Sequence, residues 1–307
     1  MQANEIQYKT FGKCLELRND TVKVLVTLDF GPRIIRYSFL EGENMFFEDT
    51  DHAFSEMNAG MEALYGAGKA WKLYGGHRLW KSPEEMVKTY YPDNNPVAYA
   101  LTENGAVFTP PAQAETGYGY EVAVTIAETG PGVTVEHRFT NHGESPVELA
   151  LWPITVLPPG GTEIVPQPTR NTGAVPRMQM AFWHYVKMTD KRLTWLDRYI
   201  ALRQDPQADG RMKFGINNEH GFAMYFHHGD LFINTFDPVL DGVYPDGGMS
   251  FETYTNPLFL EMETLGELKT ILSGETITHT ERWALYKEAL PAITDEALDS
   301  IRNKYVK

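Results

Sequence analysis

The sequence predicts an all-β fold with a few short helices. Short runs of alternating apolar and polar residues recur along the chain, as they do in strands that bury one face. Clusters of glycine, proline and asparagine separate these runs, for example Gly130-Pro131-Gly132 and Asn141-His142-Gly143, and such clusters form turns. Helical spacing of apolar residues is confined to two short segments, so strands must form most of the core.

The N-terminal part predicts a β-meander between residues 5 and 48. Val22–Leu28 and Ile34–Phe39 read as two strands that Gly31-Pro32 separates. Phe54–Tyr65 then carries Met57, Met61 and Leu64 at helical spacing, which predicts a short helix or an ordered loop.

The middle of the chain predicts strands at Tyr120–Ile126, Val133–Thr140 and Val147–Val156. Turn signals separate these runs, so we expect three consecutive antiparallel strands. The stretch from Pro158 to Asp209 is rich in proline, which predicts loops until strands resume at Trp195–Leu202.

The C-terminal part predicts the last large strands at Phe222–Phe226, Leu231–Phe236 and Phe259–Glu263. Thr294–Tyr305 has the pattern of a terminal helix, with Thr294 or Asp295 at its N-cap. No shift in composition marks a domain boundary, so we expect residues 1–307 to form a single domain.

Charge and cysteine content narrow the functional classes. The net charge of −14 opposes binding to a phosphate backbone or to an anionic membrane, so we expect no nucleic acid and no membrane partner. The single cysteine, Cys14, cannot form an internal disulfide. The N-terminus lacks the apolar core of a signal peptide, and no apolar run reaches membrane-spanning length, so we expect a cytoplasmic protein.

Two glutamates stand out in the apolar run at Phe259–Glu263. Glu261 and Glu263 are two residues apart, so on a strand both side chains point to the same side of the sheet. Two neighbouring carboxylates in a core would repel each other and lose their hydration. We therefore expect this side of the strand to face a polar cleft, the alternative being ion pairs on an exposed sheet face.

Four segments resemble one known family, in the order expected for it. They are FGPRII at Phe30–Ile35, YGGHRLWKSPEE at Tyr74–Glu85, the strand region Thr140–Gly161, and Phe259–Trp283 with its E-x-E pair. Together they resemble the galactose mutarotase-like (aldose 1-epimerase-like) superfamily. The resemblance implies a β-supersandwich with a sugar pocket on the concave face of the larger sheet, a small-molecule sugar as partner, and no cofactor or metal.

The resemblance also assigns chemical roles. A mutarotase uses a base to take the proton of the anomeric hydroxyl and an acid to protonate the ring oxygen. The family's basic glutamate corresponds to Glu261, and Glu263 beside it would tune that base or bind a hydroxyl. The family's catalytic histidine corresponds to Trp152, which cannot transfer a proton. Either His77 supplies the acid, or the pocket binds sugar without epimerising it and Trp152 is a stacking face.

Further candidates would orient the substrate. Arg33 and Arg78 offer rigid donors for hydroxyl, carboxylate or phosphate groups, and the glycines before His77 would let a ligand approach. Trp80 is either a sugar platform or part of the core, and Asp246 in a turn is a candidate rim residue.

Three functional hypotheses follow. The first is an aldose 1-epimerase-like isomerase acting at the anomeric carbon of a sugar or sugar derivative, and the second is a non-catalytic carbohydrate-binding or sensing module. The third is a lyase acting on uronic-acid sugars, with Tyr74, Tyr90 or Tyr91 as its tyrosine. His227-His228-Gly229-Asp230 is interpreted as a surface turn rather than a metal site, because adjacent strand residues point to opposite faces.

Overall fold

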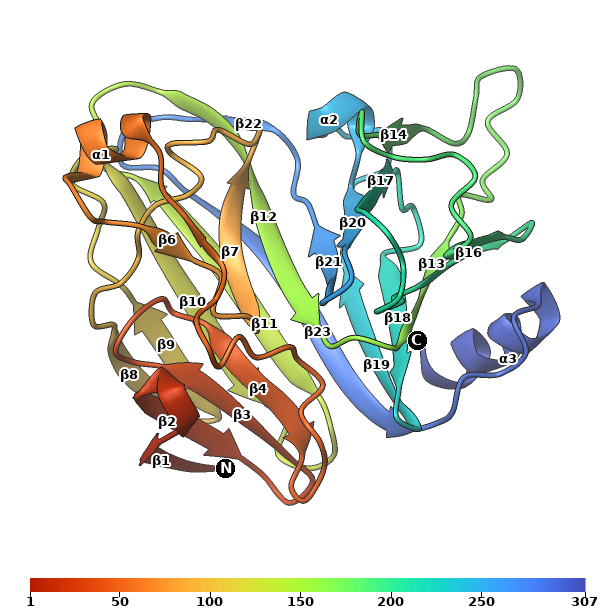
Figure 1. The fold of residues 1–307 in the computed structure, drawn as a ribbon, viewed down its shortest axis with the longest axis horizontal. Helices are drawn as coiled ribbons and strands as arrows, with labels where there is room; N and C mark the ends of the chain where they lie inside the picture. Colours follow the sequence, from red (N-terminus) through yellow and green to blue (C-terminus); the bar gives the residue numbers. More distant parts are fainter. Residues whose placement is uncertain (307) are drawn as a thin grey trace.

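The computed structural model describes residues 1–306 and confirms an all-β architecture of two large antiparallel sheets (Figure 1). Sheet 1 has 11 strands and sheet 2 has 10. Sheet 1 runs in the order β1 (Gln2–Gln7), β2 (Lys13–Arg18), β3 (Val22–Thr27), β4 (Ile34–Phe39), β7 (His77–Ser82), β12 (Val147–Leu157), β21 (Leu260–Thr264), β20 (Phe251–Thr255), β17 (Met212–Ile216) and β14 (Met180–Phe182), with β22 (Lys269–Ile271) also paired to β12.

Sheet 2 lies against sheet 1 and contains the longest strand of the molecule, β23. Its order is β15 (Leu193–Trp195), β16 (Tyr199–Arg203), β13 (Thr162–Pro166), β18 (Phe222–His227), β19 (Asp230–Phe236), β23 (Thr276–Lys287), β11 (Val133–Asn141), β10 (Tyr118–Ile126), β9 (Gly105–Thr109) and β8 (Ala98–Thr102). The largest apolar cluster fills the space between the sheets, with Tyr37 of sheet 1 packed against Phe232 and Trp283 of sheet 2. Burial of these aromatic rings supplies much of the force that holds the two sheets together.

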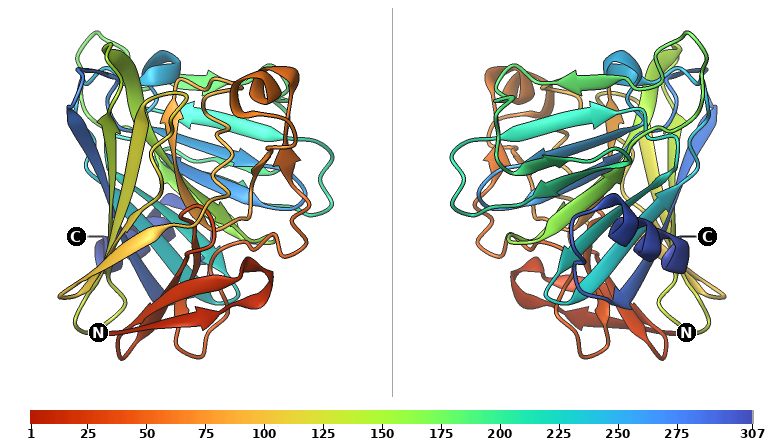
Figure 2. Two further views of the ribbon diagram at one scale, coloured as in Figure 1. Left: turned by 90° about the vertical axis from the view of Figure 1, so that its left-hand side faces the viewer. Right: turned by 90° about the vertical axis from the view of Figure 1, so that its right-hand side faces the viewer.

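The predicted terminal helix is α3 (Asp295–Tyr305), and it covers the outer face of sheet 2 (Figure 2). Leu298 and Ile301 of this helix pack on Phe222 and Ile164 of the sheet. The predicted cap is present, because the Thr294 hydroxyl accepts a hydrogen bond from the Ala297 N–H at 3.3 Å. None of the described helices is long and apolar enough to cross a membrane.

One predicted neighbour relation is wrong. β10 and β11 pair as expected, but β12 leaves them and lies in sheet 1 between β7 and β21. Every residue of β12 from Leu149 to Leu157 is buried, because one face of the strand meets the core and the other face is also covered. Alternation along a strand does not say which sheet the strand joins.

The cover over the outer face of sheet 1 comes from loops and small elements. The segment that follows β4 carries β5 (Ser55–Glu56), α1 (Ala59–Tyr65) and β6 (Trp71–Lys72). Its aromatic and apolar side chains form a separate cluster with Val156 of sheet 1 and with Phe259, which immediately precedes β21. This layer forms one wall of the cavity described next. The remaining helical elements are the single turn η1 (Lys9–Phe11) and α2 (Pro245–Gly248).

Candidate functional site

A cavity of about 420 Å³ lies on the outer face of sheet 1, under the layer that follows β4. Its floor is made by alternate residues of β7, β12, β21, β20 and β17. Nine aromatic side chains line it, namely Phe54, Trp71, Trp80, Tyr90, Trp152, Trp183, Tyr185, Tyr254 and Phe259. The face of sheet 1 that holds this cavity is turned away from sheet 2 and its helix α3. The expected cleft beside the two glutamates is therefore present.

The strand register explains why these side chains share one face. Residues directly opposite each other on paired antiparallel strands point to the same side. Ile154 lies opposite Arg78 on one side and opposite Glu263 on the other. Glu261 lies opposite Tyr254. Because side chains alternate along each strand, Arg78 is joined by Trp80, and Glu261 is joined by Glu263.

Arg78 and Glu261 form an ion pair on the cavity floor. The Arg78 Nη2 donates to the Glu261 Oε1 at 2.9 Å, and the Arg78 guanidinium lies 4.3 Å from the ring centre of Trp80. Arg78 is 3% exposed and Glu261 13% exposed, so the carboxylate is the more accessible of the two. The Nε and Nη1 of Arg78 have no hydrogen-bond partner among the described residues. Both nitrogens are buried beside Trp71 and Trp80, so a polar ligand reaches these donors only when the neighbouring rings move.

A second charged group, a buried triad, completes the floor. The Lys213 Nζ lies 2.8 Å from a Glu252 oxygen and 3.0 Å from a Glu263 oxygen, and the Trp152 indole N–H donates to Glu263 at 2.9 Å. Burial raises the pKa of Glu263 to about 7 and that of Glu252 to about 8. Burial lowers the pKa of Lys213, but the two carboxylates outweigh this effect and raise it. One ammonium thus serves two carboxyl groups, and their raised pKa values favour a protonated carboxyl near neutral pH.

The predicted position of His77 in the cleft is wrong. His77 precedes Arg78 on β7, so its side chain points to the opposite face and lies between the two sheets. Its ring is 1% exposed, and burial together with His137 lowers its pKa well below the ordinary value. The glycines before it serve a backbone contact rather than a ligand, because a side chain on Gly75 or Gly76 would collide with the carbonyl of Phe47 or of Ile34. His77 therefore cannot protonate a ligand in the cavity.

Arg33 and Asp246 also lie outside the cavity. The buried Arg33 guanidinium binds the Asp93 carboxylate through two nitrogens, one of them at 3.0 Å, and lines a separate small pocket. Asp246 belongs to the turn α2, where the Ser82 hydroxyl lies 3.4 Å from its carboxylate. Both predictions rested on position along the chain, which does not fix where a loop side chain points.

Of the three candidate lyase tyrosines, Tyr90 alone among the described residues lines the cavity. Its hydroxyl donates to Glu84 at 2.7 Å, and burial raises its pKa. Tyr74 instead donates to Asn94 at 2.7 Å. A tyrosine with a raised pKa is a poor base at neutral pH, so this arrangement gives the lyase hypothesis little support.

Sequence reasoning missed several cavity residues. Lys213 lies on β17, which was not predicted as a strand, and Arg211 immediately precedes it; Trp183 and Tyr185 come from the proline-rich middle of the chain. Glu252, the buried partner of Lys213, lies on β20, which was not predicted either. A signal was present at Lys213, because it stands between Met212 and Phe214 in a short apolar run. A lysine in that setting needs a buried carboxylate partner.

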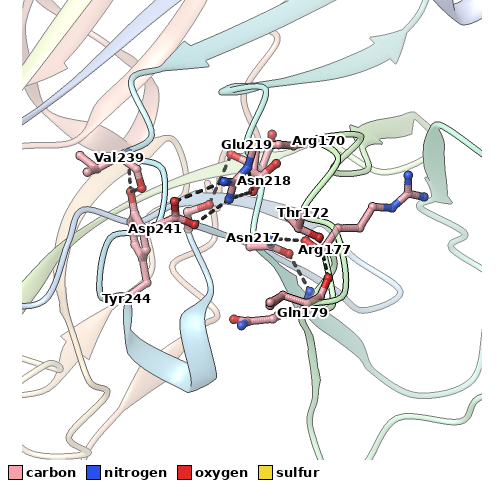
Figure 3. Close-up of polar contacts among 12 residues, drawn as sticks. Arg170, Thr172, Arg177, Gln179, Asn217, Asn218, Glu219, Val239, Asp241 and Tyr244 are labelled. Carbon is pink, nitrogen blue, oxygen red and sulfur yellow. Dashed lines mark hydrogen bonds and ion pairs between the residues drawn. The ribbon is translucent and has the colours of Figure 1, made fainter.

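Another cavity, of about 300 Å³, lies between the loops that follow β13 and β19 (Figure 3). Arg170 dominates it, but its guanidinium is already bound by Glu219 at 2.8 Å and by Asp241 at 2.7 Å. The Arg177 side chain points away from this cluster in Figure 3. These contacts fasten the two loops to each other, and the arginine charge is neutralised without a ligand.

Comparisons with solved structures identify proteins of similar fold. No protein-family model and no curated protein matches the chain. Among solved structures, a TPR-domain containing protein from Parabacteroides distasonis is similar over 91% of this chain, with a TM-score of 0.62 and 14% identity, and this chain spans 48% of its length. A putative aldose 1-epimerase from Klebsiella pneumoniae is similar over 95% of this chain and 82% of its own, with a TM-score of 0.58 and 10% identity.

A galactose mutarotase-like protein from Lactobacillus casei is similar over 89% of this chain and 100% of its own, with a TM-score of 0.53 and 12% identity. At such low identity these likenesses establish the fold and leave the activity open. They agree with the resemblance that the four sequence segments carry. The chain therefore has the galactose mutarotase-like, or aldose 1-epimerase-like, β-sandwich fold.

Proposed function

We propose that the protein binds a sugar in the cavity on sheet 1. The observation that supports this proposal is the floor itself, where aromatic rings alternate with the Arg78–Glu261 ion pair. The C–H faces of a sugar ring stack on aromatic side chains, while its hydroxyl groups need both donors and acceptors. The volume of about 420 Å³ lies in the range of small-molecule sites.

Each polar group of the floor has a defined part in this proposal. The unpartnered nitrogens of Arg78 donate to ligand oxygens once the rings beside them move, and the partly exposed Glu261 carboxylate accepts from a hydroxyl. Trp80 and Trp183 supply stacking surface. Arg211 has no carboxylate within ion-pair distance among residues 1–306, and its guanidinium lies 4.3 Å from the ring centre of Tyr185. An anionic sugar is therefore a reasonable ligand beside neutral aldoses.

Anomerisation is the second candidate function, and the partly exposed Glu261 carboxylate on the cavity floor favours it. In this scheme Glu261 removes the proton of the anomeric hydroxyl, and the ring oxygen needs an acid. No histidine lines the cavity in the described part of the chain, so the acid would be Glu263, whose pKa of about 7 keeps it partly protonated. Glu263 is only 1% exposed and accepts from Trp152, so this scheme requires the carboxyl to move toward the ligand. Binding without catalysis needs no such movement, and the geometry supports it best.

Ligand-observed NMR tests both candidates. The purified protein is mixed with free aldoses, sugar phosphates and uronates, and binding and the rate of anomeric exchange are recorded in the same samples. We expect at least one sugar class to bind, and Arg78→Leu to weaken that binding tenfold or more. No binding across the panel, or equal binding by wild type and Arg78→Leu, would contradict the proposal.

The variant Glu261→Gln separates binding from catalysis. The amide keeps the shape and one acceptor but cannot take a proton. If the protein is an isomerase, this change lowers anomeric exchange about a hundredfold or more and leaves affinity within about tenfold. Glu148→Gln is the matched control, because Glu148 is an exposed glutamate on β12 outside the cavity. If the wild-type protein binds a sugar but leaves its anomeric exchange at the uncatalysed rate, the protein is a sugar-binding protein and not an isomerase.

A further inference from the structure

A cluster of metal-ligating side chains lies on the other side of β7, between the two sheets. It consists of His77 from sheet 1 and of His137 and Glu281 from β11 and β23 of sheet 2. Their nearest ligand atoms all lie within 4.8 Å of one another, and the three side chains are between 0% and 1% exposed. The Nε2 atoms of the two histidines are 2.7 Å apart, and the His77 Nε2 lies 3.7 Å from the Glu281 Oε2.

Each histidine is oriented by a partner on its other nitrogen. The Nδ1 of His77 lies 2.8 Å from the Thr155 hydroxyl, and the Nδ1 of His137 lies 3.1 Å from the His279 carbonyl oxygen. Metal-binding histidines are usually held in this way, since the outer hydrogen bond fixes both the ring orientation and the tautomer. Both rings therefore present their Nε2 atoms to the same point.

Glu281 is oriented in the same manner. Its Oε1 accepts from the Asn234 amide at 3.0 Å and from the Thr264 hydroxyl at 2.6 Å. Its Oε2 faces the histidines and also accepts from the Trp283 indole at 3.1 Å. A carboxylate oxygen has a second lone pair, so this contact leaves room for a metal bond.

The charge of Glu281 has no permanent counterpart. This carboxyl is 0% exposed, and among residues 1–306 no lysine or arginine lies within ion-pair distance of it. All of its hydrogen-bond donors are neutral groups. Buried carboxylates are normally paired with a cation, bound to a metal, or protonated. Two imidazoles and one carboxylate form a donor set that suits divalent first-row transition ions.

We propose that His77, His137 and Glu281 bind one divalent transition-metal ion, for which Zn²⁺ is the test ion, as a structural centre that joins the two sheets. Two nitrogens that bind one zinc ion at about 2.0–2.1 Å in tetrahedral geometry are about 3.3 Å apart, so the rings must separate by about 0.6 Å from their present hydrogen bond. The His77 proton then resides on Nδ1 and is donated to the Thr155 hydroxyl oxygen, which can exchange its donor role for an acceptor role. The inference does not depend on sugar binding.

The first test uses the wild-type protein. The full chain is unfolded in urea with a chelator, refolded with or without one equivalent of Zn²⁺, and dialysed, and retained zinc is measured by elemental analysis. Refolding is included because the site is closed to solvent. We expect about one retained zinc per chain and a higher Tm for the zinc-loaded protein. In a crystal of that protein, anomalous scattering at the zinc edge should place the ion between His77 and His137. No retained zinc, or zinc bound only elsewhere, would overturn the proposal.

Variants test the ligand assignment. Glu281→Gln keeps the shape of the side chain but removes the anionic ligand, and we expect it to weaken zinc binding at least tenfold. Glu163→Gln is the matched control, because Glu163 is another fully buried glutamate, lies on β13 and does not belong to the cluster. Thr155→Val removes only the outer partner of His77 and should weaken binding less than Glu281→Gln does. Equal zinc affinity in wild type and Glu281→Gln, with both proteins folded by circular dichroism, would show that the cluster is a metal-free hydrogen-bond network.

Discussion

Replacing Lys213 with methionine should destabilise the protein in a strongly pH-dependent way. Lys213 is the one cation that contacts both Glu252 and Glu263 in the described structure, and both carboxyl groups are at most 1% exposed. Methionine has a similar length, so the change removes the charge and leaves the packing largely intact. Without the ammonium, both carboxyl groups must be protonated in the folded state, whereas the wild-type triad holds one proton for the pair.

The size of the effect follows from that extra proton. An ordinary glutamate pKa of 4.5 makes protonation at pH 7 cost about 2.5 × 1.36, or roughly 3.4 kcal/mol. At pH 5 both carboxyl groups are already protonated in the folded wild-type protein, because their pKa values are about 8 and about 7, so the variant needs no extra proton. The unfolding entropy of 307 residues is about 0.64 kcal/mol per kelvin, so a loss near 3 kcal/mol lowers Tm by about 5 °C at pH 7. The deficit should disappear at pH 5.

Differential scanning fluorimetry and urea unfolding at both pH values measure this effect. The triple variant Lys213→Met, Glu252→Gln, Glu263→Gln should recover most of the loss at pH 7, because it removes the carboxyl groups with the lysine. Lys269→Met on β22 is the control, since the Lys269 side chain is 54% exposed. A Lys213→Met protein that is as stable as wild type at pH 7, or whose deficit is the same at pH 5, would refute this account of the triad.

Three further predictions are open to direct measurement. The wild-type free energy of unfolding should include a component that falls as the pH rises from about 5 to about 8. The raised pKa values of Glu252 and Glu263 make the folded state bind a proton that the unfolded chain releases. Urea titrations at several pH values should show a flatter profile for Glu252→Gln, and an unchanged profile would contradict this prediction. Trp80→Ala should weaken sugar binding about tenfold in the NMR panel. Trp195 is 45% exposed and lies outside the cavity, so Trp195→Ala should leave sugar binding unchanged. Equal losses of affinity in the two variants would argue against a stacking role for Trp80. Thr294→Ala should cost about 1 kcal/mol of stability in urea unfolding through loss of the α3 cap, and a neutral result would mean that packing alone defines the start of this helix.

The sequence by itself determined the features that depend on local spacing. The period of two along a strand predicted that Glu261 and Glu263 share a face, and they do. The sequence also limited the cap of the terminal helix to Thr294 or Asp295, because both side chains can accept from a free N–H, and the structure selects Thr294. The all-β class followed from alternating runs and turn residues, and the order of four family-like segments predicted the particular sandwich.

Tertiary structure alone decided which face of each strand meets the cavity. The same period of two implies that His77 and Arg78 point in opposite directions, but not which of them accompanies Glu261. That choice follows from β12, which pairs with β7 and β21 in sheet 1 instead of joining β10 and β11. Likewise, Lys213 reaches Glu263 only because β17, β20 and β21 are neighbours. Strand pairing joins residues that are far apart in the chain, so local sequence patterns carry no record of it.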